Sequence, residues 1–282
     1  MSMRNHLRGR RPGGMSDSSA SSAAKIVVLG LALAFLLTAA TLVYIKGQNA
    51  VIRTDSTTLC PIDRPPSEVT VLLLDMSDEF SEPQRLKIKN ELDRLKSKIA
   101  RFGLIEAYVV DRLDQRVTKP LVHLCNPGTG DDLNRLYQNP DMARRKWEGF
   151  VHQLDEKVEL LMASPESPTS AIFEAVQATA LRTFNRPENE AIGKHLVIVS
   201  DLLQNVPGKL SQYEHTPSFR EFQSTEYFSQ VRADLKDVAV TLLYLVRPRA
   251  PQKWPDHYQF WNEYFVAQGA RVELVEPVYG AP

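Results

Sequence analysis

The order of apolar and polar residues predicts strands that alternate with helices. Four mostly apolar runs read as strands of the kind buried on both faces of a parallel sheet: residues 68–75, 104–111, 195–201 and 238–247. Between and after them, apolar residues recur at close to helical spacing. The helices expected from this spacing cover residues 83–102, 142–162, 167–184, 219–235 and 258–268.

Two further strands complete the expected sheet. Residues 116–125 follow the second strand after a short polar turn, so this strand is expected to run antiparallel to it. Residues 270–278 form the last strand. The alternation predicts one doubly wound α/β domain over residues 68–282, with a mostly parallel sheet and one antiparallel edge strand. Pro83 suits the first turn of its helix, and Gly103 is expected to be its C-terminal cap.

An uncharged apolar stretch precedes the domain. Residues 26–45 contain no charged side chain and are bracketed by Lys25 and Lys46. Twenty residues of helix span about 30 Å, the hydrocarbon thickness of a bilayer. A buried core helix and a cleaved signal peptide are the alternatives, but a signal core is usually shorter and no A-x-A site follows. We therefore expect an uncleaved transmembrane helix, after a disordered tail over residues 1–25 and before a linker over residues 46–67.

Basic residues predict the orientation of this helix. Five of them precede the apolar stretch: Arg4, Arg8, Arg10, Arg11 and Lys25. Because basic flanks stay on the cytoplasmic side, the N-terminus is expected in the cytoplasm and the domain outside it, in the periplasm if the source is bacterial. The protein would then be a single-pass membrane protein anchored through residues 26–45.

Composition and charge exclude several functions. The chain has 34 basic and 34 acidic residues and shows no basic cluster beyond the N-terminus, so no nucleic-acid partner is expected. It has no phosphate-binding loop and no G-x-S-x-G motif. A D-x-D nucleophile motif is also absent, because residue 77 is serine. We therefore expect a binding protein, and the competing enzyme class is a hydrolase with a carboxylate-bound metal.

The two cysteines, Cys60 and Cys125, both lie on the exported side. There is no C-x-x-C motif and the six histidines are scattered, which does not favour zinc. Cys60 precedes the first strand, and Cys125 ends the antiparallel strand, so both are expected at the same edge of the sheet. A disulfide between them is predicted, with two free buried thiols as the alternative.

Oxygen-bearing side chains follow two strands of the expected sheet. Asp75 and Asp201 each end an apolar strand, Ser77 and Glu79 follow the first, and Thr169 lies in a turn that begins a helix. Ligand sites of doubly wound sheets form at the carboxyl ends of the strands. Carboxylates and hydroxyls without histidine or cysteine are hard ligands, suited to Mg²⁺, Mn²⁺ or Ca²⁺.

These residues resemble the metal-ion-dependent adhesion site of von Willebrand factor A domains. That family carries D-x-S-x-S after the first strand, a threonine in a later loop and an aspartate after the fourth strand. The resemblance implies that Asp75, Ser77, Thr169 and Asp201 bind a divalent cation, and it covers residues 68–280 in element order. Glu79 stands where the second serine belongs and could take the partner's place on the metal.

The same residues also fit a simpler reading. Aspartate, serine and threonine are preferred helix caps, so these side chains could stabilise a metal-free scaffold of a membrane complex. Leu202 stands where the family commonly has glycine. An aromatic group on the last helix is expected mainly to pack on the sheet, with a partner-binding rim as the alternative: Trp254, Tyr258, Phe260, Trp261, Tyr264 and Phe265. The overall prediction is a membrane-anchored, extracytoplasmic binding module with a protein partner.

Overall fold

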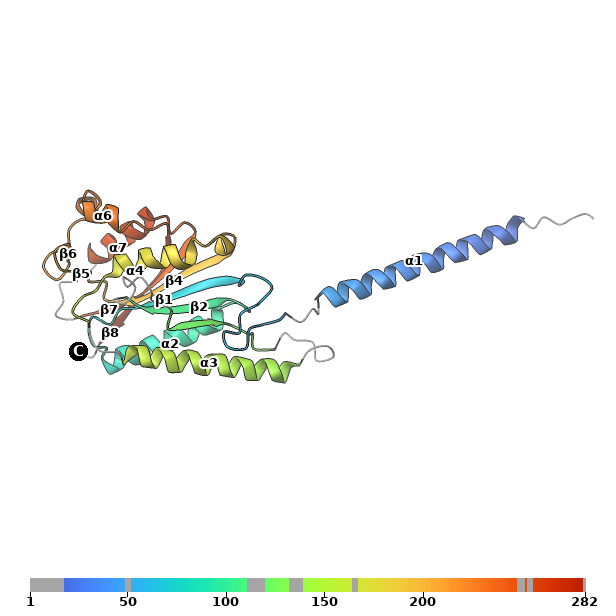
Figure 1. Ribbon diagram of the computed structural model, residues 1–282, viewed down its shortest axis with the longest axis horizontal. Coiled ribbons are helices and arrows are strands. Elements are labelled where there is room, and N and C mark those ends of the chain that lie inside the picture. Colours follow the sequence, from blue (N-terminus) through green and yellow to red (C-terminus); the bar gives the residue numbers. More distant parts are fainter. Residues whose placement is uncertain are drawn as a thin grey trace, which may run out of the picture. The chain divides into compact units, whose positions relative to one another are not determined.

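The computed structural model describes residues 18–48, 52–110, 120–131, 139–163, 167–247, 252 and 256–280. The chain forms two compact units, Met1–Val51 and Ile52–Pro282 (Figure 1). Residues 1–17 of the predicted disordered tail lie outside the described residues, and residues 18–25 are helical instead of disordered. Trp254, of the predicted aromatic group, also lies outside the described residues.

The first unit contains one long helix, α1 (Ser18–Gln48). Its stretch Lys25–Tyr44 is long and apolar enough to cross a membrane, and none of it is buried in the protein. The predicted span, residues 26–45, coincides with this stretch to within one residue.

The second unit is built on a six-stranded sheet in the order β3-β2-β1-β4-β7-β8. β3 runs antiparallel to β2, and all other neighbours are parallel, which confirms the predicted α/β class and is consistent with a von Willebrand factor A-like fold. The strands are β1 (Glu68–Leu74), β2 (Leu104–Val109), β3 (Val122–Cys125), β4 (Gly193–Ser200), β7 (Val238–Val246) and β8 (Arg271–Tyr279).

Helices cover both faces of this sheet. α2 (Glu82–Lys98) and α3 (Pro140–Met162) lie on one face, and α4 (Ile172–Thr179), α6 (Glu226–Gln230) and α7 (Asp256–Ala267) lie on the other (Figure 1). Successive residues of β1 point to opposite faces, so Val71 and Leu73 enter one core cluster while Leu72 and Leu74 enter the other. All four side chains are fully buried, as a continuous apolar strand requires.

Gly103 does not cap α2 as predicted. The helix ends at Lys98, and Phe102, with φ of 65°, takes the left-handed conformation expected of the cap. Gly103 instead allows a close approach, because a Cβ there would lie 2.8 Å from Cγ2 of Ile99 and 2.9 Å from the carbonyl oxygen of Ala100.

Two expected helices differ from the prediction. The helix expected over 167–184 begins only at Ile172, because Ser170 pairs with Asn205 in a β-bridge, and it ends in a π-helical turn, Ala180–Phe184. The helix expected over 219–235 is two short helices, α5 (Phe219–Gln223) and α6. The hydroxyl of Thr225 accepts a hydrogen bond from the backbone N–H of Phe228 and so starts α6 anew.

A small hairpin was not predicted. β5 (Asn205–Val206) and β6 (Leu210–Ser211) are joined through Gly208, which has φ of 76°. Two-residue strands are too short for an alternating pattern to indicate them.

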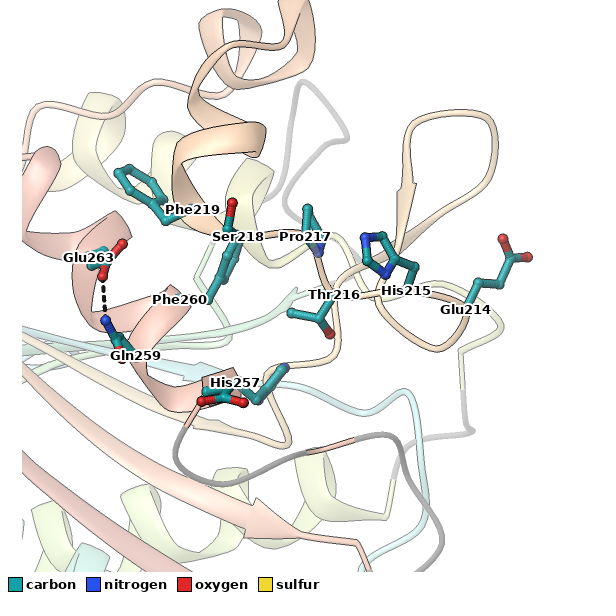
Figure 2. A pocket seen from close by; sticks show the side chains of 11 residues that line it. Glu214, His215, Thr216, Pro217, Ser218, Phe219, His257, Gln259, Phe260 and Glu263 are labelled. Atoms are coloured by element: carbon teal, nitrogen blue, oxygen red, sulfur yellow. Dashed lines mark hydrogen bonds between the residues drawn. The ribbon is translucent and has the colours of Figure 1, made fainter.

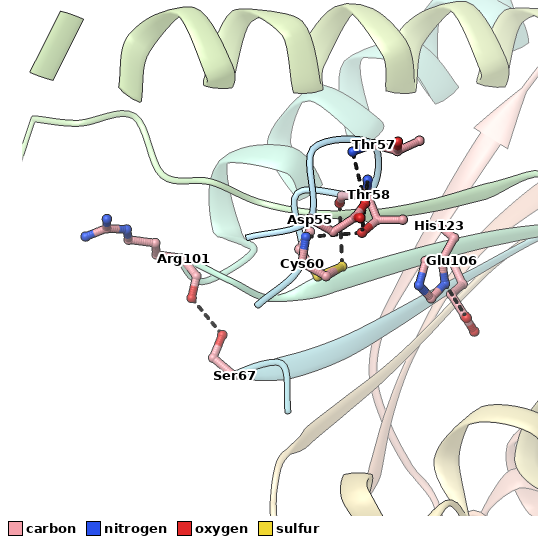
Figure 3. Close-up of a disulfide and its surroundings, with 9 residues drawn as sticks. Asp55, Thr57, Thr58, Cys60, Ser67, Arg101, Glu106 and His123 are labelled. Carbon is pink, nitrogen blue, oxygen red and sulfur yellow. Dashed lines mark hydrogen bonds and ion pairs between the residues drawn. A yellow bond between two sulfur atoms is a disulfide. The ribbon is translucent and has the colours of Figure 1, made fainter. Parts of the chain in front are cut away.

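The predicted disulfide joins Cys60 to Cys125, with their Cα atoms 4.7 Å apart. The segment around Cys60 folds onto the edge of the sheet where β1 begins (Figure 3). The N–H of Cys125 donates to the carbonyl of Thr58, and the carboxylate of Asp55 accepts from the N–H groups of Thr57 and Thr58. Residues 52–67 are thus part of the second compact unit, and only the residues before Ile52 lie outside it.

Replacing both Cys60 and Cys125 with serine is expected to destabilise the second unit. The bond closes a loop across a sequence separation of 65, for which chain entropy gives about 4 kcal/mol. Urea denaturation of a fragment covering residues 52–282 measures the change. A reducing agent should lower the wild-type midpoint and leave that of the double variant unchanged. Equal midpoints for all samples would contradict a stabilising role.

Candidate functional site

Asp75 follows β1 at the centre of the sheet and is 3% exposed. Its Oδ2 accepts hydrogen bonds from the hydroxyls of Ser170 (2.9 Å) and Ser200 (2.6 Å). Its Oδ1 accepts from the backbone N–H of Ser77 at 3.1 Å. The carboxylate is therefore enclosed by three donors from three segments of the chain.

Asp201 follows β4, the neighbour of β1, and is 1% exposed. Its Oδ1 accepts from the backbone N–H of Leu203 at 3.0 Å. Its Oδ2 is buried, has no hydrogen-bond partner among the described residues and lies 3.5 Å from Nε of Arg247. Leu202, between Asp201 and Leu203, has a left-handed backbone conformation with φ of 60°, in which glycine would be unstrained.

Burial disfavours the charged form of both carboxylates. It raises the pKa of Asp75, against the opposing hydrogen bonds from Ser200 and Ser170. Burial also raises the pKa of Asp201 well above its usual range, and the negative charge of Asp75 raises it further. Two acidic groups shielded from solvent therefore lie at the ends of adjacent strands, and burial favours the protonated form of each.

Arg247, at the end of β7, supplies a positive charge to this pair. Its side chain is 17% exposed. Besides the contact with Asp201, it donates to the carbonyl oxygen of Glu79 at 2.7 Å and to that of Asp78 at 3.4 Å. The guanidinium thus connects the end of β7 to the loop after β1.

Further hydrogen bonds connect the other loops at this edge. The side-chain oxygen of Gln204 accepts from the N–H groups of Ile172 (2.7 Å) and Phe173 (3.1 Å), at the start of α4. The N–H of Ser167 donates to the carbonyl of Met76, and the hydroxyl of Tyr213 donates to the carboxylate of Asp78. The loops after β1 and β4, the start of α4 and the segment after β6 are therefore fixed to one another.

The structure brings together only some of the predicted residues. Asp75 and Asp201 are neighbours as expected, and Ser77 donates its backbone N–H to Asp75. The hydroxyl that reaches Asp75 from the α4 turn belongs to Ser170, whereas the Thr169 hydroxyl lies 3.4 Å from that of Ser167. The side chain of Glu79 is exposed, and the residue reaches the cluster through its carbonyl oxygen.

Six residues of the site were not predicted: Asp78, Ser170, Ser200, Gln204, Tyr213 and Arg247. Two of them had a signal in the sequence. Ser170 is the hydroxyl residue closest to the first buried residue of α4, and Arg247 ends a strand at the same edge as the two aspartates. Tyr213 had none, because a short unpredicted hairpin carries it there.

The arrangement does not fit a divalent cation. Both oxygens of Asp75 accept hydrogen bonds, and so does one oxygen of Asp201. The remaining Oδ2 of Asp201 lies 3.5 Å from Nε of Arg247, so a metal ion on this oxygen would lie close to a positive charge. No group of three or more histidine, cysteine or acidic side chains that could hold a metal exists within the described part of the chain. The positive charge next to Asp201 among the described residues is the Arg247 guanidinium.

No protein-family model and no curated protein matches the chain. Among solved structures, it is similar to the conserved hypothetical protein BatB from Bacteroides thetaiotaomicron, with 13% identity, 76% of this chain and 91% of that chain covered, and a TM-score of 0.39. It is also similar to an aerotolerance-related membrane protein from Bacteroides fragilis NCTC 9343, with 11% identity, 75% of this chain and 91% of that chain covered, and a TM-score of 0.32. A third similar structure is the manganese-loaded TRAP protein from Plasmodium vivax, with 14% identity, 77% of this chain and 68% of that chain covered, and a TM-score of 0.31. Similarities of this size assign no function to the chain.

Arg247→Met is expected to destabilise the second unit by about 3 kcal/mol at neutral pH, since it leaves the buried Asp201 carboxylate unpaired. Urea denaturation measures this loss. Mg²⁺ or Mn²⁺ should leave the wild-type midpoint unchanged, because a metal ion on Asp201 would lie close to the guanidinium. Arg271→Met is the matched control, because Arg271 pairs with Glu273 on the exposed side of β8.

The loss of stability caused by Arg247→Met should be smaller at pH 5 than at pH 7. A carboxyl group with a raised pKa in the folded state binds more protons there than in the unfolded chain. Its folded form is therefore favoured in acid, and this advantage is lost as the pH rises through the folded pKa. Asp201→Asn in the Arg247→Met background should likewise restore stability. A wild-type midpoint that rises with Mg²⁺, and does not rise in Asp75→Ala, would contradict the arginine assignment.

Proposed function

We propose that the protein is a single-pass membrane protein whose second unit binds a partner protein outside the cytoplasm. The binding surface is the carboxyl edge of the sheet, around the Asp75–Asp201 pair. What supports this location is the topology: the chain winds from β1 toward β3 on one side and from β4 toward β8 on the other. The carboxyl ends of β1 and β4 therefore flank the switch point, where α/β sheets bind their ligands.

The observation that carries a binding role is the fixed arrangement of the loops at this edge. Segments from five parts of the chain are connected through Asp75, Arg247, Gln204 and Tyr213. Rigid loops lose little conformational entropy on association, so the edge is pre-organised for a partner. Tyr213 remains 39% exposed above this network and offers an aromatic contact.

A catalytic role has less support. The hydroxyls of Ser170 and Ser200 donate to Asp75, which is buried and already accepts a third hydrogen bond. This carboxylate is therefore not placed to take a proton from a substrate. The competing reading, a hydrolase with a carboxylate-bound metal, would place a metal ion near Asp201, whose Oδ2 lies 3.5 Å from Nε of Arg247.

Photo-crosslinking tests the binding edge. Tyr213 is replaced by p-benzoylphenylalanine in the full-length protein in its native membrane, and the control places the same group at Ile62, which is 61% exposed near the disulfide. An adduct of one defined mass is expected at position 213 and none at position 62. Excess fragment 52–282 should compete for this adduct, and the Arg247→Met fragment should not. Adducts at position 62 alone would contradict the proposal.

The membrane topology has its own test. A reporter fused after Pro282 is expected to be exported, and one fused at the N-terminus to remain cytoplasmic, because five basic residues precede the apolar stretch. Replacing Arg4, Arg8, Arg10 and Arg11 with glutamine should weaken this orientation. Export of the N-terminal reporter in the unaltered chain would contradict it.

A further inference from the structure

A pocket of about 540 Å³ lies between residues 214–218 and the first turns of α7 (Figure 2). It adjoins the site described above. Tyr213, the residue before the pocket, donates to Asp78. On the other wall, His257 is hydrogen-bonded to Tyr244, whose pKa is raised by burial and by the charge of Asp201. The pocket therefore continues the proposed binding edge.

Three carboxylates line the pocket, from Glu214, Asp256 and Glu263, and no lysine or arginine does. Glu263 accepts one hydrogen bond, from Gln259 at 2.8 Å. Among the residues that the structure describes, no cationic side chain forms an ion pair with these carboxylates, so this part of the wall is acidic.

The apolar part of the pocket is formed by Phe219 and Phe260. Both rings are at least nine-tenths buried, and they meet edge to face with centroids 6.1 Å apart. Phe260 also packs against Phe222 and Phe173 in the core. A rigid aromatic surface thus lies next to the carboxylates.

His257 places a buried ring nitrogen beside the pocket. It is 1% exposed, and its Nδ1 shares a hydrogen bond with the Tyr244 hydroxyl at 2.8 Å. Burial lowers its pKa to about 4, opposed in part by the nearby Leu202 backbone, so the ring is neutral at pH 7. Nε2 has no hydrogen-bond partner among the residues that the structure describes. An unpaired buried ring nitrogen beside a pocket points to a polar group of a ligand.

We propose that this pocket binds a lysine- or arginine-bearing segment of the partner protein, an inference that rests on the proposed function. Long basic side chains pack their methylene stems on apolar surfaces and keep the charged head outside. Phe219 and Phe260 supply the surface, aromatic rings attract the cation, and the three carboxylates neutralise it. The pocket volume lies within the range of sites for small ligands and leaves room for more than one side chain.

Fluorescence anisotropy with the full-length protein in neutral detergent tests the pocket. The probe is a labelled seven-residue peptide that contains one lysine and one arginine. The comparison peptide has glutamate at both positions. Saturable binding of the basic peptide and none of the acidic peptide is expected. Equal binding of both peptides, or binding of neither, would overturn the proposal.

Matched variants distinguish binding in the pocket from general attraction of the basic peptide to the negative charge of the protein. Asp256→Asn combined with Glu263→Gln should raise the Kd of the basic peptide about tenfold or more. Glu148→Gln removes one carboxylate from the exposed side of α3, outside the pocket, and should leave the Kd of the basic peptide unchanged. An unchanged Kd in the double variant overturns the proposal. If the double variant fails to fold, Glu214→Gln in the exposed loop gives the same test.

The two proposals fail in different ways. If position 213 forms its adduct but the pocket variants bind the peptide like the wild type, the binding edge stands and the basic segment is wrong. If position 213 forms no adduct in the membrane, the binding edge itself is wrong.

Discussion

The contact between Arg247 and the buried Asp75–Asp201 pair is the constraint on which the carboxyl edge depends. Two carboxylates without solvent destabilise a fold unless they are protonated or paired. Here the hydroxyls of Ser170 and Ser200 stabilise one of them, and the guanidinium lies 3.5 Å from the other. Because these groups come from β4, β7 and the start of α4, satisfying the pair also fixes the positions of the loops.

This arrangement explains why the loops suit binding better than chemistry. The side chains that would be reactive in an exposed site are used to hold the edge together. Ser170 and Ser200 donate inward, and the Arg247 guanidinium also bonds to the carbonyl oxygens of Asp78 and Glu79. What remains for a ligand is the surface above, where Tyr213 is exposed and the acidic pocket opens beside it.

The opposite edge of the sheet has a different construction. There the covalent bond between Cys60 and Cys125 fastens the segment that leads into β1. The hydroxyl of Ser67 donates to the carbonyl of Arg101 close by (Figure 3). The chain thus enters the domain through a fixed segment at one edge, while the candidate binding residues occupy the other.

The sequence by itself determined the sheet. The apolar runs of β1, β2, β4 and β7 were evident because both their faces are buried. The short polar connection after β2 was enough to predict the antiparallel β3. It also determined that Asp75 and Asp201 lie together, because both end central strands at the same edge. The bridge between Cys60 and Cys125 followed from the same strand directions.

Only the tertiary structure decided which side chains complete the site. Ser170 rather than Thr169 reaches Asp75 because a β-bridge to Asn205 delays the start of α4 and sets which hydroxyl points inward. Arg247 is far from both aspartates in the chain, so its place at the end of a strand indicated the edge but not its contact with Asp201. Side-chain direction within a turn depends on contacts with distant segments, and local patterns carry no record of those contacts.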